Sequence, residues 1–231
     1  MDALIKTTRV EKLHLLSYSD PDGVAIVMPS LNVEKATETA KILLKRAGMT
    51  TTVFIVEDTV RQGFIKTLND TAAQLRVRYL AYVAEDAFPG VDWLRSAHAR
   101  LEETNRGLLA FNCGKWRGRI AAFGLVRLSW VKQLYGGPVF FPAYKAHKAD
   151  NELTVIARVQ DQLVYDPNCV LVEIDADKQF RETVPEDKAT FRERFRSGFS
   201  GLASLEELRP LAAEYFVPMD VNSADRKPRD A

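Results

Sequence analysis

The sequence is poor in cysteine: Cys113 and Cys169 lie far apart, and no CxxC spacing occurs. We therefore expect neither a cysteine zinc site nor a disulfide framework. Long apolar runs are also missing, because no stretch could span a bilayer and residues 1–20 lack the apolar core of a signal peptide. The chain is accordingly predicted to be cytoplasmic, and a peripheral contact at the inner face of the membrane stays open.

An excess of one charge is absent too, since 32 Lys and Arg residues stand against 31 Asp and Glu residues. No global positive field draws the chain onto nucleic acid, so no nucleic-acid partner is expected. The phosphate-binding patterns GxxxxGK[ST] and GxGxxG do not occur, nor does the GxSxG of α/β-hydrolases. With 231 residues, 46% of them apolar, the chain is long enough to bury one core.

The sequence does contain an alternation of apolar runs and helical patterns. Short apolar or β-branched runs predict buried strands, and each precedes a segment with helical spacing. Such a strand–helix repeat is typical of a parallel sheet with right-handed crossovers. The predicted strands are Val24–Pro29, Thr51–Val56 and Tyr79–Val83, and the predicted helices are Val33–Ala47, Phe64–Leu75 and Trp93–Thr104.

The second half of the chain is less regular, and Pro167 interrupts its last apolar run. Ser204 and Glu207 have the spacing of a capping box that opens a final helix. We expect an α/β fold, with one domain over 21–218, an N-terminal extension over 1–20 and a polar tail over 219–231. Its mixed, mostly parallel sheet is flanked by helices. The further predicted elements are strands at Gly107–Asn112, Ile120–Leu128 and the end of Leu163–Ile174, and helices at Asp150–Gln160 and Phe191–Phe199.

Polar residues follow each of the first three predicted strands: Ser30 to Asn32, Glu57 with Asp58, and Glu85 with Asp86. Parallel strands end at one edge of a sheet, and ligands of open α/β sheets bind beyond that edge. Loops are polar in any case, so this alignment suggests a ligand site without proving one.

The pair Glu85–Asp86 forms the first candidate for chemistry. Carboxylates on a strand-end turn suit a hard divalent cation such as Mg²⁺ or Mn²⁺, which can bridge a diphosphate and neutralise a leaving group. The alternative is a solvated pair of loop acids, and the spacing by itself favours that alternative.

The second candidate is Asp150 in the segment HKADNELT. Asp is common at a helix N-cap, and local chemistry favours that role at this predicted helix start. A carboxylate aimed into a cleft could instead take the proton from an acceptor hydroxyl. On that interpretation Glu152 could hydrogen-bond the acceptor, whereas His147 is expected to pack or to lie at the surface.

The third candidate is the loop NCGKWRG, which places Lys115 beside Trp116. Aromatic faces stack on sugars, and Lys or Arg contacts phosphates. Trp116 could equally cap the core.

Taken in order, these segments resemble the GT-A-fold glycosyltransferases of family two. The segments that carry the resemblance cover roughly residues 24 to 175. They are VAIVMPSLN, IVED, GFIKTLNDTA, YVAEDAFPGVDWL and FFPAYKAHKADNELTVIARVQDQLVYDPNCVLVE.

The resemblance implies an inverting, metal-dependent hexosyltransferase of surface polysaccharide or glycan synthesis. Its donor is a nucleotide sugar, with a UDP-sugar favoured, and its acceptor is a glycan or lipid-linked hydroxyl. Asp150 matches the catalytic base and Asp86 the last acid of the metal-binding DxD turn. Asp58 and Asn69 match positions that contact the donor. The complete set of predicted substrate-binding residues is Pro29, Ser30, Asn32, Asp58, Asn69, Glu85, Lys115, Trp116 and Glu152.

The sequence departs from the family pattern in two places. Ala84 stands where the first acid of DxD is usual, and acids at Glu173, Asp175 and Asp177 stand near the position of a usual histidine ligand. One of those acids could replace the histidine, or metal dependence itself is in doubt. Two other functions stay open: a nucleotidyltransferase that makes nucleotide sugars, which the loop SLNVEK disfavours, and a non-catalytic nucleotide-sugar-binding module.

Overall fold

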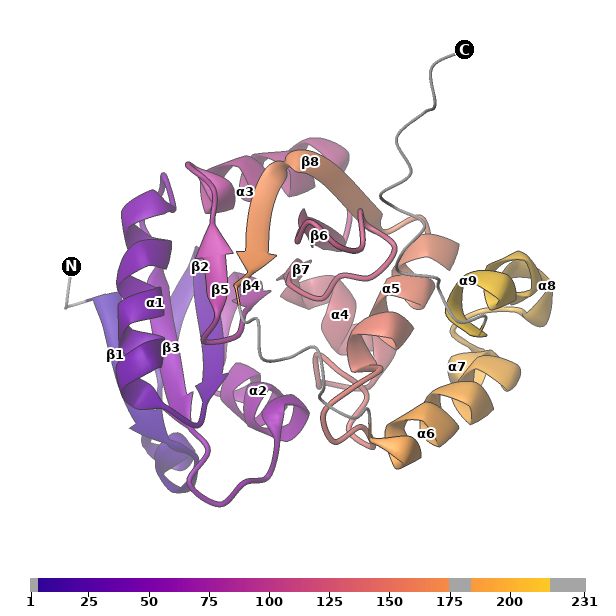
Figure 1. The fold of residues 1–231 in the computed structure, drawn as a ribbon, viewed down its shortest axis with the longest axis horizontal. Helices are drawn as coiled ribbons and strands as arrows, with labels where there is room; N and C mark the ends of the chain where they lie inside the picture. Colours follow the sequence, from indigo (N-terminus) through magenta and orange to yellow (C-terminus); the bar gives the residue numbers. More distant parts are fainter. Residues whose placement is uncertain (1–3, 175–183, 217–231) are drawn as a thin grey trace, which may run out of the picture.

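The computed structural model describes residues 4–174 and 184–216, and they form an eight-stranded sheet between layers of helices (Figure 1). The strand order is β1-β3-β2-β4-β7-β6-β8-β5. The strands are β1 (Ile5–Arg9), β2 (Tyr18–Ser30), β3 (Thr52–Glu57), β4 (Leu75–Tyr82), β5 (Ala87–Pro89), β6 (Leu108–Asn112), β7 (Gly124–Arg127) and β8 (Leu163–Glu173).

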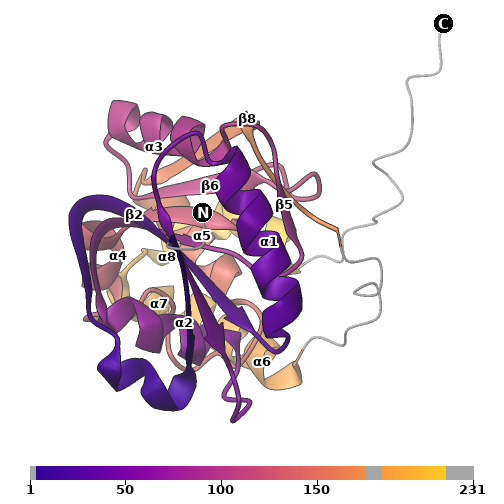
Figure 2. The same cartoon turned by 90° about the vertical axis from the view of Figure 1, so that its left-hand side faces the viewer.

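The half of the sheet from β1 to β4 is parallel, as the strand–helix alternation predicts. Strand β7 then pairs antiparallel with both β4 and β6, β8 runs parallel to β6, and β5 runs antiparallel to β8. The sheet is therefore mixed but mostly parallel, which confirms the predicted fold class. Figure 2 looks onto the β1 edge, with α1 (Val33–Arg46) towards the viewer.

Two apolar cores lie on opposite faces of this sheet. Along β2, Ala25 and Val27 belong to one core, whereas Val24, Ile26 and Met28 belong to the other. This alternation follows from the two-residue side-chain period of a strand. The first core also contains residues of α2 (Phe64–Ala73), α4 (Leu128–Leu134) and α5 (Ala149–Val159), and the second contains residues of α1 and α3 (Trp93–Thr104).

The C-terminal helices lie at the end of the molecule opposite β1 (Figure 1). Phe191, Phe195 and Phe199 stack on one another, and Tyr215 packs on Phe191. All of them adjoin the core that contains α5. These elements are α6 (Pro185–Arg196), α7 (Gly198–Gly201), α8 (Leu205–Leu208), the 3-10 turn η4 (Arg209–Leu211) and α9 (Ala212–Phe216), and a further 3-10 turn, η2 (Val10–Leu15), follows β1.

Several boundaries differ from the predictions. Residues 5–9, assigned to an N-terminal extension, form an edge strand of the sheet. Pro167 does not interrupt the last strand, because the register of β8 against β6 shifts at that point and accommodates it. The basic helix begins at Pro185 instead of Phe191, with proline in its first turn. The capping box of Ser204 and Glu207 is confirmed, and the predicted polar tail over 219–231 lies outside the described residues.

Candidate functional site

The ends of β2, β3 and β4 meet at one edge of the sheet, as predicted. Ser30 donates a hydrogen bond from its Oγ to Glu85 Oε2 at 2.6 Å, which joins the end of β2 to the turn after β4. The backbone N–H of Asn32 donates to the same Ser30 hydroxyl at 2.9 Å, and that of Asp58 donates to the Ser30 carbonyl at 2.9 Å. Residues from three separate segments therefore meet in one small region.

Asn32 is the N-cap of α1, because its Oδ1 accepts the Lys35 backbone N–H at 3.0 Å. Pro29 is buried in β2, and Ser30 is only 4% exposed. These residues shape the end of the strand. Among Pro29, Ser30 and Asn32, the exposed residue is Asn32.

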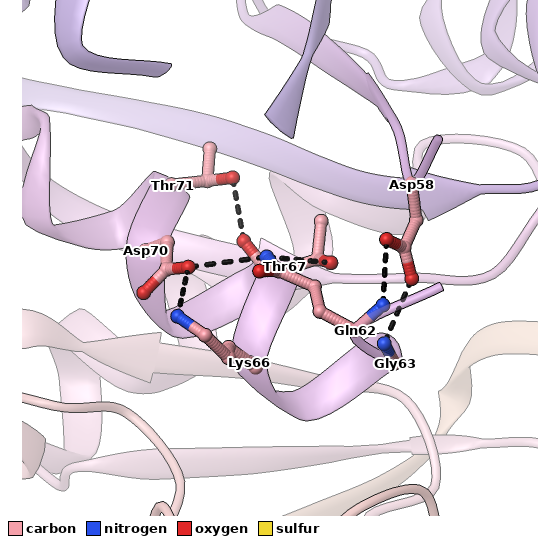
Figure 3. Close-up of polar contacts among 7 residues, drawn as sticks. All are labelled: Asp58, Gln62, Gly63, Lys66, Thr67, Asp70 and Thr71. Carbon is pink, nitrogen blue, oxygen red and sulfur yellow. Dashed lines mark hydrogen bonds and ion pairs between the residues drawn. The ribbon is translucent and has the colours of Figure 1, made fainter. Parts of the chain in front are cut away.

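Asp58 organises the loop that enters α2 (Figure 3). Its Oδ1 accepts the Gln62 backbone N–H at 2.9 Å, and its Oδ2 accepts that of Gly63 at 2.8 Å. Gln62 in turn donates to Thr67 and Asp70 on the helix. Each carboxylate oxygen can accept more than one bond, so a contact with a nucleobase stays a prediction for Asp58.

Asn69 binds protein backbone in this structure. Its Oδ1 accepts the N–H groups of Val139 and Phe140, each at 3.0 Å, and its Nδ2 donates to the Phe140 carbonyl at 2.9 Å. The side chain thus joins α2 to the segment that leads into α5. The donor contact that the resemblance implies for Asn69 remains a prediction, and its observed partners give it a scaffolding role.

The candidate metal turn brings Asp86 and the end of β8 together. Asp86 is 7% exposed, and its carbonyl accepts the backbone N–H of Ile174 at 3.0 Å. Glu173 pairs in register with Ala87, so an acid of β8 lies beside the turn. Asp175 and Asp177 lie outside the described residues. Within 4–174 and 184–216, no group of three or more His, Cys, Asp and Glu side chains is arranged to hold a metal ion.

These residues fit a cation that is bound together with a ligand. Asp86 supplies a hard carboxylate oxygen, whereas Ala84 supplies none and Glu85 already accepts from Ser30. Mg²⁺ is commonly held by one or two carboxylates plus substrate phosphates. The donor set at this turn is therefore suited to a metal whose remaining ligands are phosphate oxygens and water.

Asp150 lies at the second position of α5 and does not cap the helix. Lys148 is the N-cap residue, so the capping role considered for Asp150 is wrong. The Asp150 side chain is half-buried, and burial raises its pKa. Burial and the charge of Asp150 together raise the pKa of Tyr82, the last residue of β4. Hydrogen bonds also join the Asp150 segment to β4: the Thr154 hydroxyl donates to the Asp150 carbonyl and accepts the Ala121 N–H, and the Tyr82 hydroxyl donates to the Ala121 carbonyl.

Three neighbours of Asp150 oppose the effect of burial. Lys148 and His147 lower the pKa of Asp150, and the backbone N–H of Asn151 donates to its Oδ1 at 2.9 Å. Burial in turn lowers the pKa of Lys148. A half-buried carboxylate with a raised pKa, close to a ligand edge, has the properties of a general base.

Glu152 occupies the protein interior and is 0% exposed. Arg194 of α6 binds it with two hydrogen bonds of 2.7 Å each, and the Tyr144 hydroxyl donates to it at 2.7 Å. The acceptor contact considered for Glu152 is not possible in this arrangement, because no part of its side chain reaches solvent. Its role is to join α5 to α6.

Lys115 and Trp116 lie on the loop after β6. Lys115 is exposed, Trp116 is half-buried, and the Lys115 Nζ lies 5.3 Å from the centroid of the indole ring. The half-buried ring leaves part of its surface available. Contacts of this pair with sugar or phosphate remain predictions.

A cavity of about 430 Å³ opens beside the strand ends, at the carboxyl ends of β1 and β3. Arg9 binds Glu57 across it at 2.8 Å. From the sequence, the neighbouring Asn32 and Asp58 are predicted site residues, but β1 is not, because residues 1–20 are predicted to form an N-terminal extension. The cavity is lined by Thr7, Thr8, Arg9, Lys12, Val33 and Glu57.

Comparisons with known proteins identify the fold. No protein-family model matches the chain, and no curated protein matches it in sequence. Among solved structures, S. aureus TarS superimposes with a TM-score of 0.64 at 15% identity, over 90% of this chain and 46% of TarS. The fragment TarS 1–349 in complex with UDP gives a TM-score of 0.61 at 15% identity, over 89% of this chain and 76% of the fragment.

A third similar structure is the mannosyltransferase PcManGT from Pyrobaculum calidifontis, in complex with GDP-Man and Mn²⁺. It gives a TM-score of 0.54 at 14% identity, over 89% of this chain and 80% of that protein. The chain spans about half the length of full TarS. These similarities show that the chain has a GT-A-like fold.

Proposed function

We propose that the chain is a glycosyltransferase that moves a sugar from a nucleotide donor to a hydroxyl acceptor with inversion. The observation that carries the proposal is the placement of Asp150, a half-buried carboxylate whose segment is joined by hydrogen bonds through Thr154 and Ala121 to Tyr82 of β4. The GT-A-like fold supports it, because similar structures hold UDP, UDP-GlcNAc or GDP-Man. Fold alone does not determine function, so the site has to carry the argument.

In the proposed reaction, Asp150 accepts the proton of the acceptor hydroxyl. The acceptor oxygen forms its bond to the anomeric carbon while the bond from that carbon to the diphosphate oxygen breaks. The products are the glycosylated acceptor, with inverted configuration, and the nucleoside diphosphate. The transition state has oxocarbenium character, as in glycoside hydrolysis.

The nucleotide end of the donor would lie over the ends of β2 and β3, where Asn32 and Asp58 adjoin the cavity at Glu57. A UDP-sugar is favoured, and a surface glycan or lipid-linked acceptor is the expected co-substrate. A bound Mg²⁺ or Mn²⁺ would neutralise charge on the diphosphate, with Asp86 as its protein ligand.

Peripheral membrane contact for such an acceptor could use the exposed Arg192 and Arg196 of α6. No helix in the described ranges is long and apolar enough to cross a membrane.

A nucleotidyltransferase and a non-catalytic binding module are the two competing functions. A nucleotidyltransferase would consume a sugar phosphate and a nucleoside triphosphate and release pyrophosphate, which a coupled assay detects. A binding module would bind the donor without turnover and would be insensitive to substitution of Asp150. The position of Asp150 favours the transferase over both.

The first test is donor binding. We expect UDP to raise the melting temperature of the full chain, and we expect Mn²⁺ to increase that shift, because the turn at Asp86 needs phosphate oxygens to complete a metal shell. Thermal shift and calorimetry with UDP, GDP and their sugars, each with and without Mn²⁺, provide the measurement. No binding of any nucleoside diphosphate at millimolar concentration would refute the proposed function.

The second test concerns the metal ligand. Asp86→Asn should abolish most of the Mn²⁺-dependent part of the UDP shift, because a neutral amide is a poor ligand for a hard cation. Glu103→Gln is the matched control, since its exposed side chain on α3 pairs only with Arg100 in the described contacts. Titration of Mn²⁺ into the UDP complex of each variant gives the affinity. Equal Mn²⁺ affinity in the Asp86→Asn and unaltered proteins would exclude Asp86 as the ligand.

A further inference from the structure

Asp187, in the first turn of α6, binds a run of backbone that leads to Asp150. It is 1% exposed, and its Oδ1 accepts the Lys145 N–H at 2.9 Å. Its Oδ2 accepts the N–H groups of Ala146 at 2.9 Å and His147 at 2.7 Å. Three consecutive N–H groups that converge on one carboxylate form an anion-binding nest, and here the anion belongs to the protein itself.

The residue after this nest holds an unfavourable backbone conformation. Lys148 has φ of 70°, in the left-handed region, and it is the N-cap of α5. Such a conformation is unfavourable for a residue other than glycine, and it persists only where the surroundings enforce it. The three bonds to Asp187 fix the preceding residues and so enforce the turn from which Asp150 projects two residues later.

On its other side, the segment 145–147 lies close to the loop before α2. The Lys145 carbonyl lies so close to Gly63 that a Cβ there would be 2.6 Å from its oxygen. Gly63 is the residue whose N–H is bound by Asp58. The segment that leads to Asp150 therefore lies between Asp187, which binds its N–H groups, and the loop at the end of β3.

We propose that Asp187 is a positioning residue that fixes the direction of Asp150 towards the acceptor, an inference that rests on the proposed function of Asp150. A carboxylate is required because it offers acceptors to all three N–H groups on its two oxygens. Asparagine offers one oxygen and turns an NH₂ donor towards the remaining N–H groups. Asp187→Asn therefore loses at least one bond of the nest and loosens the turn at Lys148.

The experiment compares Asp187→Asn with Glu186→Gln, the neighbouring acid of the same turn, which is 65% exposed and lies 4.0 Å from Lys145 Nζ. We expect Asp187→Asn to lower kcat by about 100-fold, the order of loss that a misplacement of about 1 Å causes, with the Kd for UDP unchanged. Glu186→Gln should leave kcat unchanged. A loss of melting temperature with unchanged kcat would show a merely structural role and overturn the proposal.

A double variant separates positioning from an independent effect. If Asp187 acts through Asp150, adding Asp187→Asn to Asp150→Asn should lower kcat by less than threefold, because the group being positioned is already gone. Multiplicative losses would overturn the proposal.

Two readouts do not depend on turnover, so they decide the proposal even if the chain transfers no sugar. Amide exchange at 145–147 should become faster in Asp187→Asn than in Glu186→Gln. Carbon NMR titration should show the pKa of Asp150 moving towards its ordinary value, because the loosened turn exposes the carboxylate to water. Unchanged exchange and an unchanged Asp150 titration would refute Asp187 as the positioning residue.

Discussion

Replacement of Asp150 by Asn should reduce the rate of sugar transfer by about 100- to 10,000-fold, the range that general-base assistance contributes. Asparagine keeps the size of the side chain but cannot take the acceptor proton. Donor binding should be unchanged, because the proton transfer involves the acceptor. The fold should also persist, because Asp150 does not cap α5 and Lys148 occupies the cap position. Turnover, UDP affinity and melting temperature are to be measured on one preparation.

Asp161→Asn serves as the matched control for that variant. Asp161 follows the other end of α5, and its side chain is 83% exposed and paired with Arg106. The same change of charge there should leave turnover within about twofold, since surface substitutions away from buried features have small effects. Near-normal turnover in Asp150→Asn would rule out the base assignment and favour a binding module.

The pH dependence follows from the direction of the Asp150 shift. Burial raises the pKa of Asp150 above its ordinary value, so the active carboxylate form is lost at a higher pH than for an exposed aspartate. Turnover should fall as the pH drops through that raised pKa, and UDP affinity should not follow the same curve. A pH–rate profile with an acid limb that is missing in Asp150→Asn is the expected result.

The parallel half of the fold was predictable because local pattern and topology agree there. The apolar runs at β2, β3 and β4 are buried on both faces, as parallel strands between helix layers must be. Strand β5 and helix α4 were not predicted. The three residues of β5 have no pattern of their own, and they form a strand because β8 lies beside them.

The location of the candidate site could be predicted from the sequence, but the hydrogen-bond partners of its residues could not. The sequence indicated that Ser30, Asp58 and Glu85 meet, and the hydrogen bonds between their segments confirm it. It could not show that Asn69 binds the backbone 70 residues later, or that Glu152 is paired with Arg194. A single sequence carries no signal for the long-range partners of a polar side chain. It also does not distinguish a buried carboxylate from an exposed one.

The same limit hides the roles of Asp187 and Arg194, neither of which is a predicted site residue. The spacing of seven residues from Asp187 to Arg194 places both near one face of α6, and both are buried. Charged residues that recur on the apolar face of a helix are therefore the signal that could have found them. A buried charge needs a partner, and here the partners lie in the segment that carries Asp150.

Replacement of Arg194 by Met should lower the free energy of unfolding by about 3–5 kcal/mol, the usual effect of removing one partner of a buried ion pair. Arg194 makes both bidentate bonds to Glu152 and stacks its guanidinium over Phe141 at 3.4 Å from the ring centroid. Met fills much of the space and leaves Glu152 the hydrogen bond from the Tyr144 hydroxyl, but no cation to pair with its charge. Urea denaturation at pH 7 gives the change in unfolding free energy.

Two further variants test whether the uncompensated charge of Glu152 causes the loss of unfolding free energy. Arg192→Met removes a cation from the exposed face of the same helix and should change stability by less than about 0.5 kcal/mol. Glu152→Gln combined with Arg194→Met removes the uncompensated charge, and its amide oxygen still accepts from Tyr144. This double variant should be more stable than Arg194→Met alone, because the cost of an unpaired buried ion exceeds that of a neutral polar group.

The pH dependence of Arg194→Met gives the sharpest check. Without its cation, Glu152 should have a folded-state pKa raised above its unfolded value, because burial disfavours the charged form. The destabilisation is then full above the raised pKa and shrinks as the pH falls towards the unfolded value, where both states bind the proton. Arg194→Met should therefore approach the stability of the double variant in mildly acidic solution. A deficit that stays constant from neutral to acidic pH would mean that lost packing over Phe141, and not the charge of Glu152, sets the effect.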